Sequence, residues 1–139
     1  MRTRVLVLVL LATACGNNPV EEEWIGLFPG ILKHYGDQAV IDIPEVVAIS
    51  DIVTITVHTY GLGGGCSSKG ETRVSDSGHT ILIEPFDSVT SVACEEILLL
   101  FAHQVTATFS AQGMVFVELR GREWPENKPY STRRRIFVR

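Results

Sequence analysis

The strictest pattern in this 139-residue chain is a period of two over residues 52–60, IVTITVHTY. Successive side chains of an extended chain point to opposite faces, so this segment has one face for a core and one for solvent. β-Branched residues at this period indicate a half-buried strand. The predicted inner face holds Val53, Ile55, Val57 and Thr59, and the outer face holds Thr54, Thr56, His58 and Tyr60.

The rest of the chain continues in short strand-like segments separated by turn residues. Pro44 ends one of them, over residues 40–43, because proline cannot donate to a strand ladder. No segment has a strong helical period, so we expect an all-β sandwich of seven to eight strands. The other strand-like segments are 72–74, 80–83, 105–109, 114–120 and 134–138, with an apolar run at 97–101 and predicted loops at 61–70 and 85–94.

The first fourteen residues have the three-part layout of a secretory signal. Arg2 and Arg4 supply positive charge, residues 5–12 form an apolar run, and small residues follow at 13–15. A run of eight residues is too short to span a bilayer, which needs about twenty. Residues 1–14 are therefore expected to be a cleaved signal peptide.

The string LATAC at residues 11–15 resembles the lipobox of bacterial lipoproteins. In that family the cysteine is lipidated on sulfur and becomes the first residue, which the resemblance implies for Cys15. The match departs from the pattern because Leu11 stands four places before the cysteine, where the family has its large apolar residue three places before. Gly16, rather than Asp, follows Cys15, and by resemblance this favours the outer membrane. The alternative is an ordinary signal with an incidental cysteine.

Residues 16–23 are polar and contain Pro19 and three consecutive glutamates, and Gly26, Pro29 and Gly30 interrupt the stretch that follows, so residues 15–30 are expected to be a lipidated tether. Residues 31–139 then form one domain, large enough to bury a core without a metal. Loss of residues 1–14 leaves ten basic and sixteen acidic residues, a net charge of −6. Seven of the basic residues lie from Arg120 onward. These basic residues would either let the last strand pair with the acidic remainder of the domain or dock onto anionic lipid or cell-wall polymer. The expected export of the chain argues against nucleic acid as a partner.

A second resemblance covers residues 31–139. The strand at 52–60 leads into Gly-Gly-Cys at 64–66, Cys94 follows a Pro-Phe-Asp loop, and a Thr-Ala-Thr-Phe strand meets a Gly-X-Val-X-Val hairpin at 113–117. This arrangement resembles the small immunoglobulin-like domains of bacterial surface lipoproteins, which implies an immunoglobulin-like β-sandwich. One departure is that both cysteines sit on predicted loops with no Trp between them, so the inter-sheet Cys–Trp–Cys pin of antibody domains is absent.

Cys66 and Cys94 are the only thiols left once Cys15 is lipidated. In an oxidising compartment such a pair is expected to form a disulfide. A metal site would need nearby Cys or His ligands at tight spacing, which neither cysteine has. A catalytic thiol would need a partner base and would leave an odd cysteine.

Other candidate chemistry is weaker. The Gly-rich segment at 61–70 has the order Ser-Lys-Gly before a strand, whereas a phosphate loop needs Gly-Lys-Ser/Thr before a helix. The histidines show no metal-binding motif, and His103 is in phase with Phe101 and Val105, which favours a core or bulge position over a ligand role. Glu95 and Glu96 would point to opposite faces of a strand. We therefore expect no cofactor, no metal and no catalytic residue.

One aromatic group remains as a candidate binding surface. Trp124 and Tyr130 lie near Arg122, and aromatic residues beside arginine are common anchors of binding sites. The same residues could instead plug the open end of a sandwich. The sequence therefore predicts a lipid-anchored, non-enzymatic binding or structural module of the cell envelope, whose partner would be an envelope protein or cell-wall polymer. The alternative is a small hydrolase or metal-binding protein whose site is assembled by folding from residues such as His58, Glu84 and Asp87.

Overall fold

The computed structural model describes residues 25–62, 65–90, 94 and 97–139, and every regular element in these ranges is a β-strand. Cys15 and the expected signal peptide lie outside the described residues. The described ranges contain no helix long and apolar enough to cross a membrane. The strands are β1 (Gly26–Pro29), β2 (Ile31–His34), β3 (Ile41–Asp42), β4 (Val46–Val47), β5 (Ile52–Leu62), β6 (Ser67–Asp76), β7 (Thr80–Val89), β8 (Leu98–Thr108), β9 (Gly113–Trp124) and β10 (Lys128–Val138).

These ten strands form one mixed sheet, which confirms the all-β class. Three long antiparallel pairs make most of it: β5 with β8, β6 with β7, and β9 with β10. Parallel pairing then joins β7 and β2 to β9, and β4 to β10. The strand count is higher than the seven or eight expected, because short pieces such as β1, β3 and β4 also pair.

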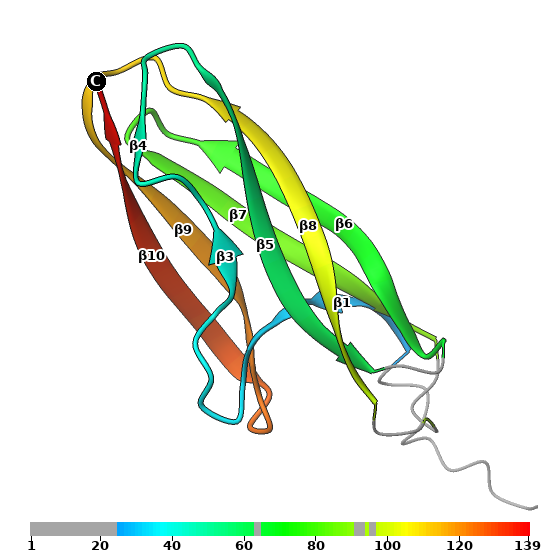
Figure 1. Cartoon of the computed structure of the whole chain (residues 1–139). Coiled ribbons are helices and arrows are strands. Elements are labelled where there is room, and N and C mark those ends of the chain that lie inside the picture. The colour runs from blue at the N-terminus through cyan, green and yellow to red at the C-terminus, as the bar shows by residue number, and fades with distance from the viewer. Residues whose placement is uncertain (1–24, 63–64, 91–93, 95–96) are drawn as a thin grey trace, which may run out of the picture.

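The sheet folds over so that β5 and β8 lie across from β6 and β7 (Figure 1). The predicted alternation of residues 52–60 is confirmed on its inner face, where Val53, Ile55, Val57 and Thr59 are all buried. Tyr60, expected on the outer face, is also buried. Tyr60 is buried because β2 pairs with β5 at this residue and the His34 ring stacks on the tyrosine.

Strand β7 contradicts the predicted loop at 85–94, because it continues through Pro85 to Val89. Proline in a strand is normally confined to edges and bulges. Here the partner strand β6 is irregular between Lys69 and Thr72, directly next to the pair formed by Thr72 and Pro85. The Pro85 carbonyl still accepts a hydrogen bond from Gly30 N at 2.8 Å. A bulge therefore accommodates the proline, and the strand runs on to Asp87.

Three other boundaries differ from expectation. The predicted loop at 61–70 is shorter, because β5 continues to Leu62 and β6 begins at Ser67. The runs at 97–101 and 105–109 merge into the single strand β8. Strand β1 lies inside the range 15–30 assigned to the tether, and it pairs with β7 from Gly26 to Pro29. The sheet therefore already includes residues before Ile31, where the domain was expected to begin.

Candidate binding pocket

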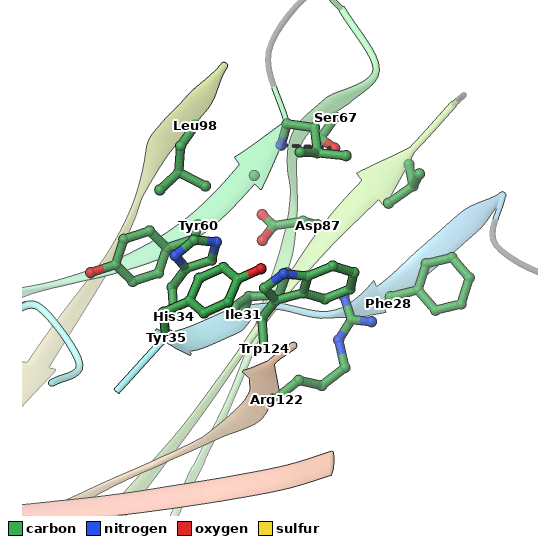
Figure 2. Close-up of a pocket in the computed structure, with 13 residues that line it drawn as sticks. Phe28, Ile31, His34, Tyr35, Tyr60, Ser67, Asp87, Leu98, Arg122 and Trp124 are labelled. Carbon is green, nitrogen blue, oxygen red and sulfur yellow. Dashed lines mark hydrogen bonds between the residues drawn. The ribbon is translucent and has the colours of Figure 1, made fainter. Parts of the chain in front are cut away.

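A half-open pocket of about 550 Å³ lies at one end of the folded sheet, where β5 ends and β8 begins (Figure 2). Phe28 on β1 lines it, so the pocket is at the end where the described chain starts. Leu62 and Leu98 form part of its apolar wall. Pockets of this size, mostly apolar with a few polar groups, are the usual form of a small-molecule site.

A buried carboxylate reaches the pocket from β7. Asp87 lines the pocket although it is only 4% exposed. Its Oδ1 lies 2.9 Å from Nε2 of His103, which is fully buried on β8. Thr59 Oγ1 lies 3.2 Å from the same nitrogen, and Thr72 Oγ1 lies 2.8 Å from Nδ1. Four strands thus meet in one polar cluster inside the core.

The cluster holds the His103 ring at both nitrogens. With the ring neutral and its proton on Nε2, that nitrogen donates to Asp87 Oδ1 and Nδ1 accepts from the Thr72 hydroxyl. The prediction that His103 occupies a core position is confirmed. Because both nitrogens are engaged inside the protein, the imidazole presents no free nitrogen to the pocket.

Aromatic side chains form the opposite wall. The rings of His34 and Tyr60 stack with centroids 5.3 Å apart, and Tyr35 meets His34 edge-on at 4.7 Å. Burial, together with the charge of Asp37, raises the pKa of the Tyr60 hydroxyl. Tyr35 is 71% exposed and has a φ of 49°, so it projects from a turn at the mouth. Trp124 completes this wall from β9 (Figure 2).

Arg122 is the cation of the pocket. Its Nε donates to the Pro29 carbonyl, and its Nη1 donates to Asn127 Oδ1 at 2.8 Å. The guanidinium lies 5.5 Å from the centroid of the Phe28 ring, within range of a cation–π contact. Burial lowers the pKa of Arg122, and the negative charge of Asp87 acts in the opposite direction.

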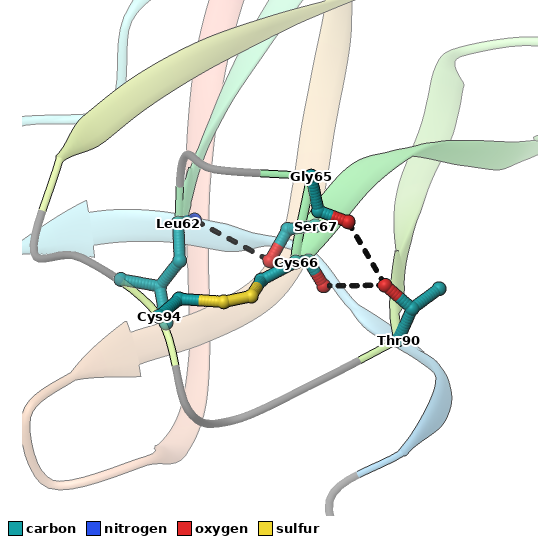
Figure 3. The surroundings of a disulfide bond; sticks show 6 residues. All are labelled: Leu62, Gly65, Cys66, Ser67, Thr90 and Cys94. Atoms are coloured by element: carbon teal, nitrogen blue, oxygen red, sulfur yellow. Dashed lines mark hydrogen bonds between the residues drawn. A yellow bond between two sulfur atoms is a disulfide. The ribbon is translucent and has the colours of Figure 1, made fainter.

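The two remaining cysteines border the same end of the molecule. Cys66 and Cys94 are at disulfide distance, with Cα atoms 6.3 Å apart (Figure 3). The Thr90 hydroxyl, 3.0 Å from the Gly65 carbonyl and 3.3 Å from the Cys66 carbonyl, holds the chain beside the bridge. Ser67, the next residue after the bridge, lines the pocket and accepts a hydrogen bond from Leu62 N. The bridge therefore braces one side of the pocket.

The structure brings together two of the three aromatic-group candidates. Trp124 and Arg122 both line the pocket. Tyr130 does not, because it faces a different side of the β9–β10 pair, where it packs against the core and lies 5.6 Å from the Lys33 ammonium. The basic residues of β10 are partly paired, as with Arg133 and Glu118.

The residues named for the hydrolase alternative are not brought together. Asp87 faces the core, whereas Glu84 on the same strand falls on the alternate, outward side. His58 likewise lies on the side of β5 opposite its buried residues. Within the described ranges no group of three His, Cys, Asp or Glu side chains is placed to hold a metal ion. Glu95 and Glu96 lie outside those ranges.

Sequence reasoning missed most of the pocket wall. His34 on β2 and Tyr60 on β5 are far apart in the chain, Tyr35 lies in the turn after β2, and Phe28 lies in the range 15–30 expected to be a tether. The sequence did contain one indication that Asp87 is buried. Asp87 follows Ile81, Ile83 and Pro85 at a period of two, so all four side chains lie on the same side of the strand. A carboxylate on the buried side of a strand needs a hydrogen-bonding partner inside the protein.

The chain matches no protein-family model, and no match to it was found among curated proteins or solved structures. Fold and site therefore define an all-β protein with an aromatic pocket at one end.

Proposed function

We propose that this chain is a lipid-anchored protein of the bacterial cell envelope, and that its β domain is a non-enzymatic binding module. The observation that carries the proposal is the aromatic pocket. It has the volume and apolar wall of a ligand site and contains few, fixed polar groups. The His103 ring, the most obvious general base, has both nitrogens engaged within the core.

The position of the pocket fits a lipid anchor at Cys15. Ile25, the first described residue, is ten positions after Cys15, with nine residues between them. At about 3.3–3.6 Å per residue, this tether reaches at most about 35 Å. The pocket end would then face the membrane at short range. The strand tip beside the pocket supports an interaction there, because Leu98, Leu99 and Leu100 are 44%, 41% and 51% exposed.

We also propose that the folded sheet is an immunoglobulin-like sandwich. Alternate buried residues of β5 and β8 pack against those of β7 and β9, as in two sheets that share a core. The parallel pairings of β2 and β7 with β9 depart from the antiparallel sheets of that fold. A crystal structure would test the assignment, and a closed barrel would exclude it.

Anchoring is tested by the mass of protein extracted from membranes. The expected mass is that of residues 15–139 plus acyl groups, and Cys15→Ser should release the protein from the membrane fraction. Ala14→Ser, which leaves the cysteine in place, is the matched control and should stay anchored. An unmodified, soluble protein with a different first residue would exclude the anchor.

Binding at the pocket is tested with Nile red, a neutral apolar dye whose fluorescence rises in apolar surroundings. Leu98→Arg at the pocket wall should weaken dye binding about tenfold or more. Val74→Arg on β6 is the control, because Val74 has a similar exposure, 48% against 44%, but does not line the pocket. Equal binding by both variants would place the dye elsewhere and contradict the proposal.

A further inference from the structure

One atom on the pocket floor lacks a hydrogen-bond donor. Asp87 Oδ1 accepts from His103, but Oδ2 is buried and has no hydrogen-bond partner among the described residues. Buried polar atoms are paired in the great majority of cases, because leaving water without a new partner costs free energy. For an ionised oxygen this cost is larger than for a neutral one. The site therefore lacks a donor.

The surroundings of this oxygen direct it toward the pocket. In the view of Figure 2 the carboxylate lies between Ser67 above and the side chains of Tyr35 and Trp124 below. Gly30 closes another side, because a Cβ built there would lie 3.1 Å from Oδ2 and would collide with Thr59. No protein side chain can approach from that direction. A donor reaching Oδ2 has to come through the pocket.

The walls of the pocket favour a cation with an apolar body. The aromatic side chains of Tyr60, Tyr35 and Trp124 line the same pocket as Asp87. Ring faces attract ammonium groups, and the attraction is strongest where water is excluded. Leu62 and Leu98 extend the wall outward and suit a hydrocarbon or aromatic portion.

Arg122 does not fill this role. Its Nε and Nη1 are bonded to Pro29 and Asn127, and its plane rests near Phe28. These contacts hold the guanidinium at the β1 side of the pocket. It balances the charge of Asp87 without donating to Oδ2.

We propose that the pocket binds a small molecule that carries a protonated primary amine on an apolar or aromatic body, with the amine donating to Asp87 Oδ2. This inference rests on the proposed binding function and names its ligand class. A charged donor distinguishes the amine from an alcohol of the same shape, because hydrogen bonds to ionised groups are about twice as strong as neutral ones.

The test is isothermal titration of the mature chain with matched pairs of probes. Phenethylamine and octylamine should bind about tenfold more tightly than 2-phenylethanol and octanol, and 3-phenylpropionate should bind most weakly. Asp87→Asn should reduce amine affinity to the level of the alcohol and leave alcohol binding unchanged. Asp42→Asn, which removes an exposed carboxylate on β3, is the control and should change neither affinity.

A second variant guards against misfolding of Asp87→Asn, since Asp87 also bonds to His103. Tyr35→Asn removes an exposed ring from the mouth, and asparagine tolerates the positive φ at this position. It should lower amine affinity several-fold with an unchanged thermal melt. Equal affinities for amine and alcohol in the wild-type chain would overturn the amine assignment while leaving an apolar binding site. Absence of binding by every probe and by Nile red would overturn the binding function as well.

Discussion

At the residue scale, the polar cluster around His103 shows how a core can hold charge-bearing groups. His103 and Thr59 are fully buried, and Asp87 is nearly so. Each histidine nitrogen has a partner, which avoids the penalty of an unpaired buried donor or acceptor. The exception is Oδ2 of Asp87, which has no hydrogen-bond partner among the described residues, and Asp87 lines the pocket. The unmet hydrogen bond is thus located at the proposed ligand site.

Glu118 supplies a test of the same physics at the surface. Hydrogen bonds from Arg133 and Arg120 lower the pKa of this carboxyl below its ordinary value of 4.5. A lowered folded-state pKa means that the stabilisation is present above pH 4.5 and is lost as the pH falls through the folded value. We predict that Glu118→Gln lowers stability at pH 7 and flattens the decline of stability as the pH falls below 4.5.

The measurement is the urea midpoint over a series of pH values. Glu45→Gln, at an exposed position, is the control and should retain the wild-type slope. Identical acid slopes for the wild type and Glu118→Gln would show that the two arginines contribute nothing to stability.

At the element scale, the Cys66–Cys94 bridge ties the start of β6 to the segment before β8. The cysteines are 28 residues apart, and the chain-entropy model gives about 3–4 kcal/mol for a loop of this length. We predict that the double change to Ser lowers the unfolding free energy by about this amount and keeps the β circular-dichroism spectrum. Long strands on either side hold the fold, so only the melting temperature should fall.

Thr90→Val is the matched control for the bridge. It removes the hydroxyl contacts to Gly65 and Cys66 but keeps the backbone bond from Thr90 N to the Cys66 carbonyl at 2.8 Å. Its effect should be smaller, about 1 kcal/mol. Two free thiols in unfolded, non-reduced protein from the native envelope would contradict the pairing.

At the scale of the whole molecule, one apolar core spans the folded sheet. It joins residues from β2 to β10, including Leu32, Ile55, Ile83, Leu119 and Ile136, all fully buried. A core that links β2 to β10 is expected to unfold cooperatively. We predict that thermal melts of the mature chain coincide with and without a strong chelator, because apolar burial supplies the driving force. A drop of many degrees in chelator would instead reveal a structural metal.

Much of the secondary structure was decided by local sequence. The alternation over residues 52–60 predicted both β5 and its inner face, since the phase of an extended chain fixes which side chains can be buried together. The same rule, applied to Phe101, His103 and Val105, indicated that His103 lies in the core. Turn residues marked the connection between β6 and β7 correctly. The all-β class followed from these local patterns.

The tertiary structure decided the rest. Pro85 indicated a loop, but a bulge in β6 accommodates it and carries Asp87 into the core. Pairing with β2 and stacking of His34 bury Tyr60, and pairing with β7 brings Gly26–Pro29 into the sheet. The pocket joins residues of β1, β2, β5, β6, β7, β8 and β9, whose order in space no local pattern encodes. Strand periodicity determines which face of a strand a side chain lies on, whereas long-range strand pairing determines which faces come together. The pocket depends on that pairing, because its lining residues come from strands that are far apart in the chain.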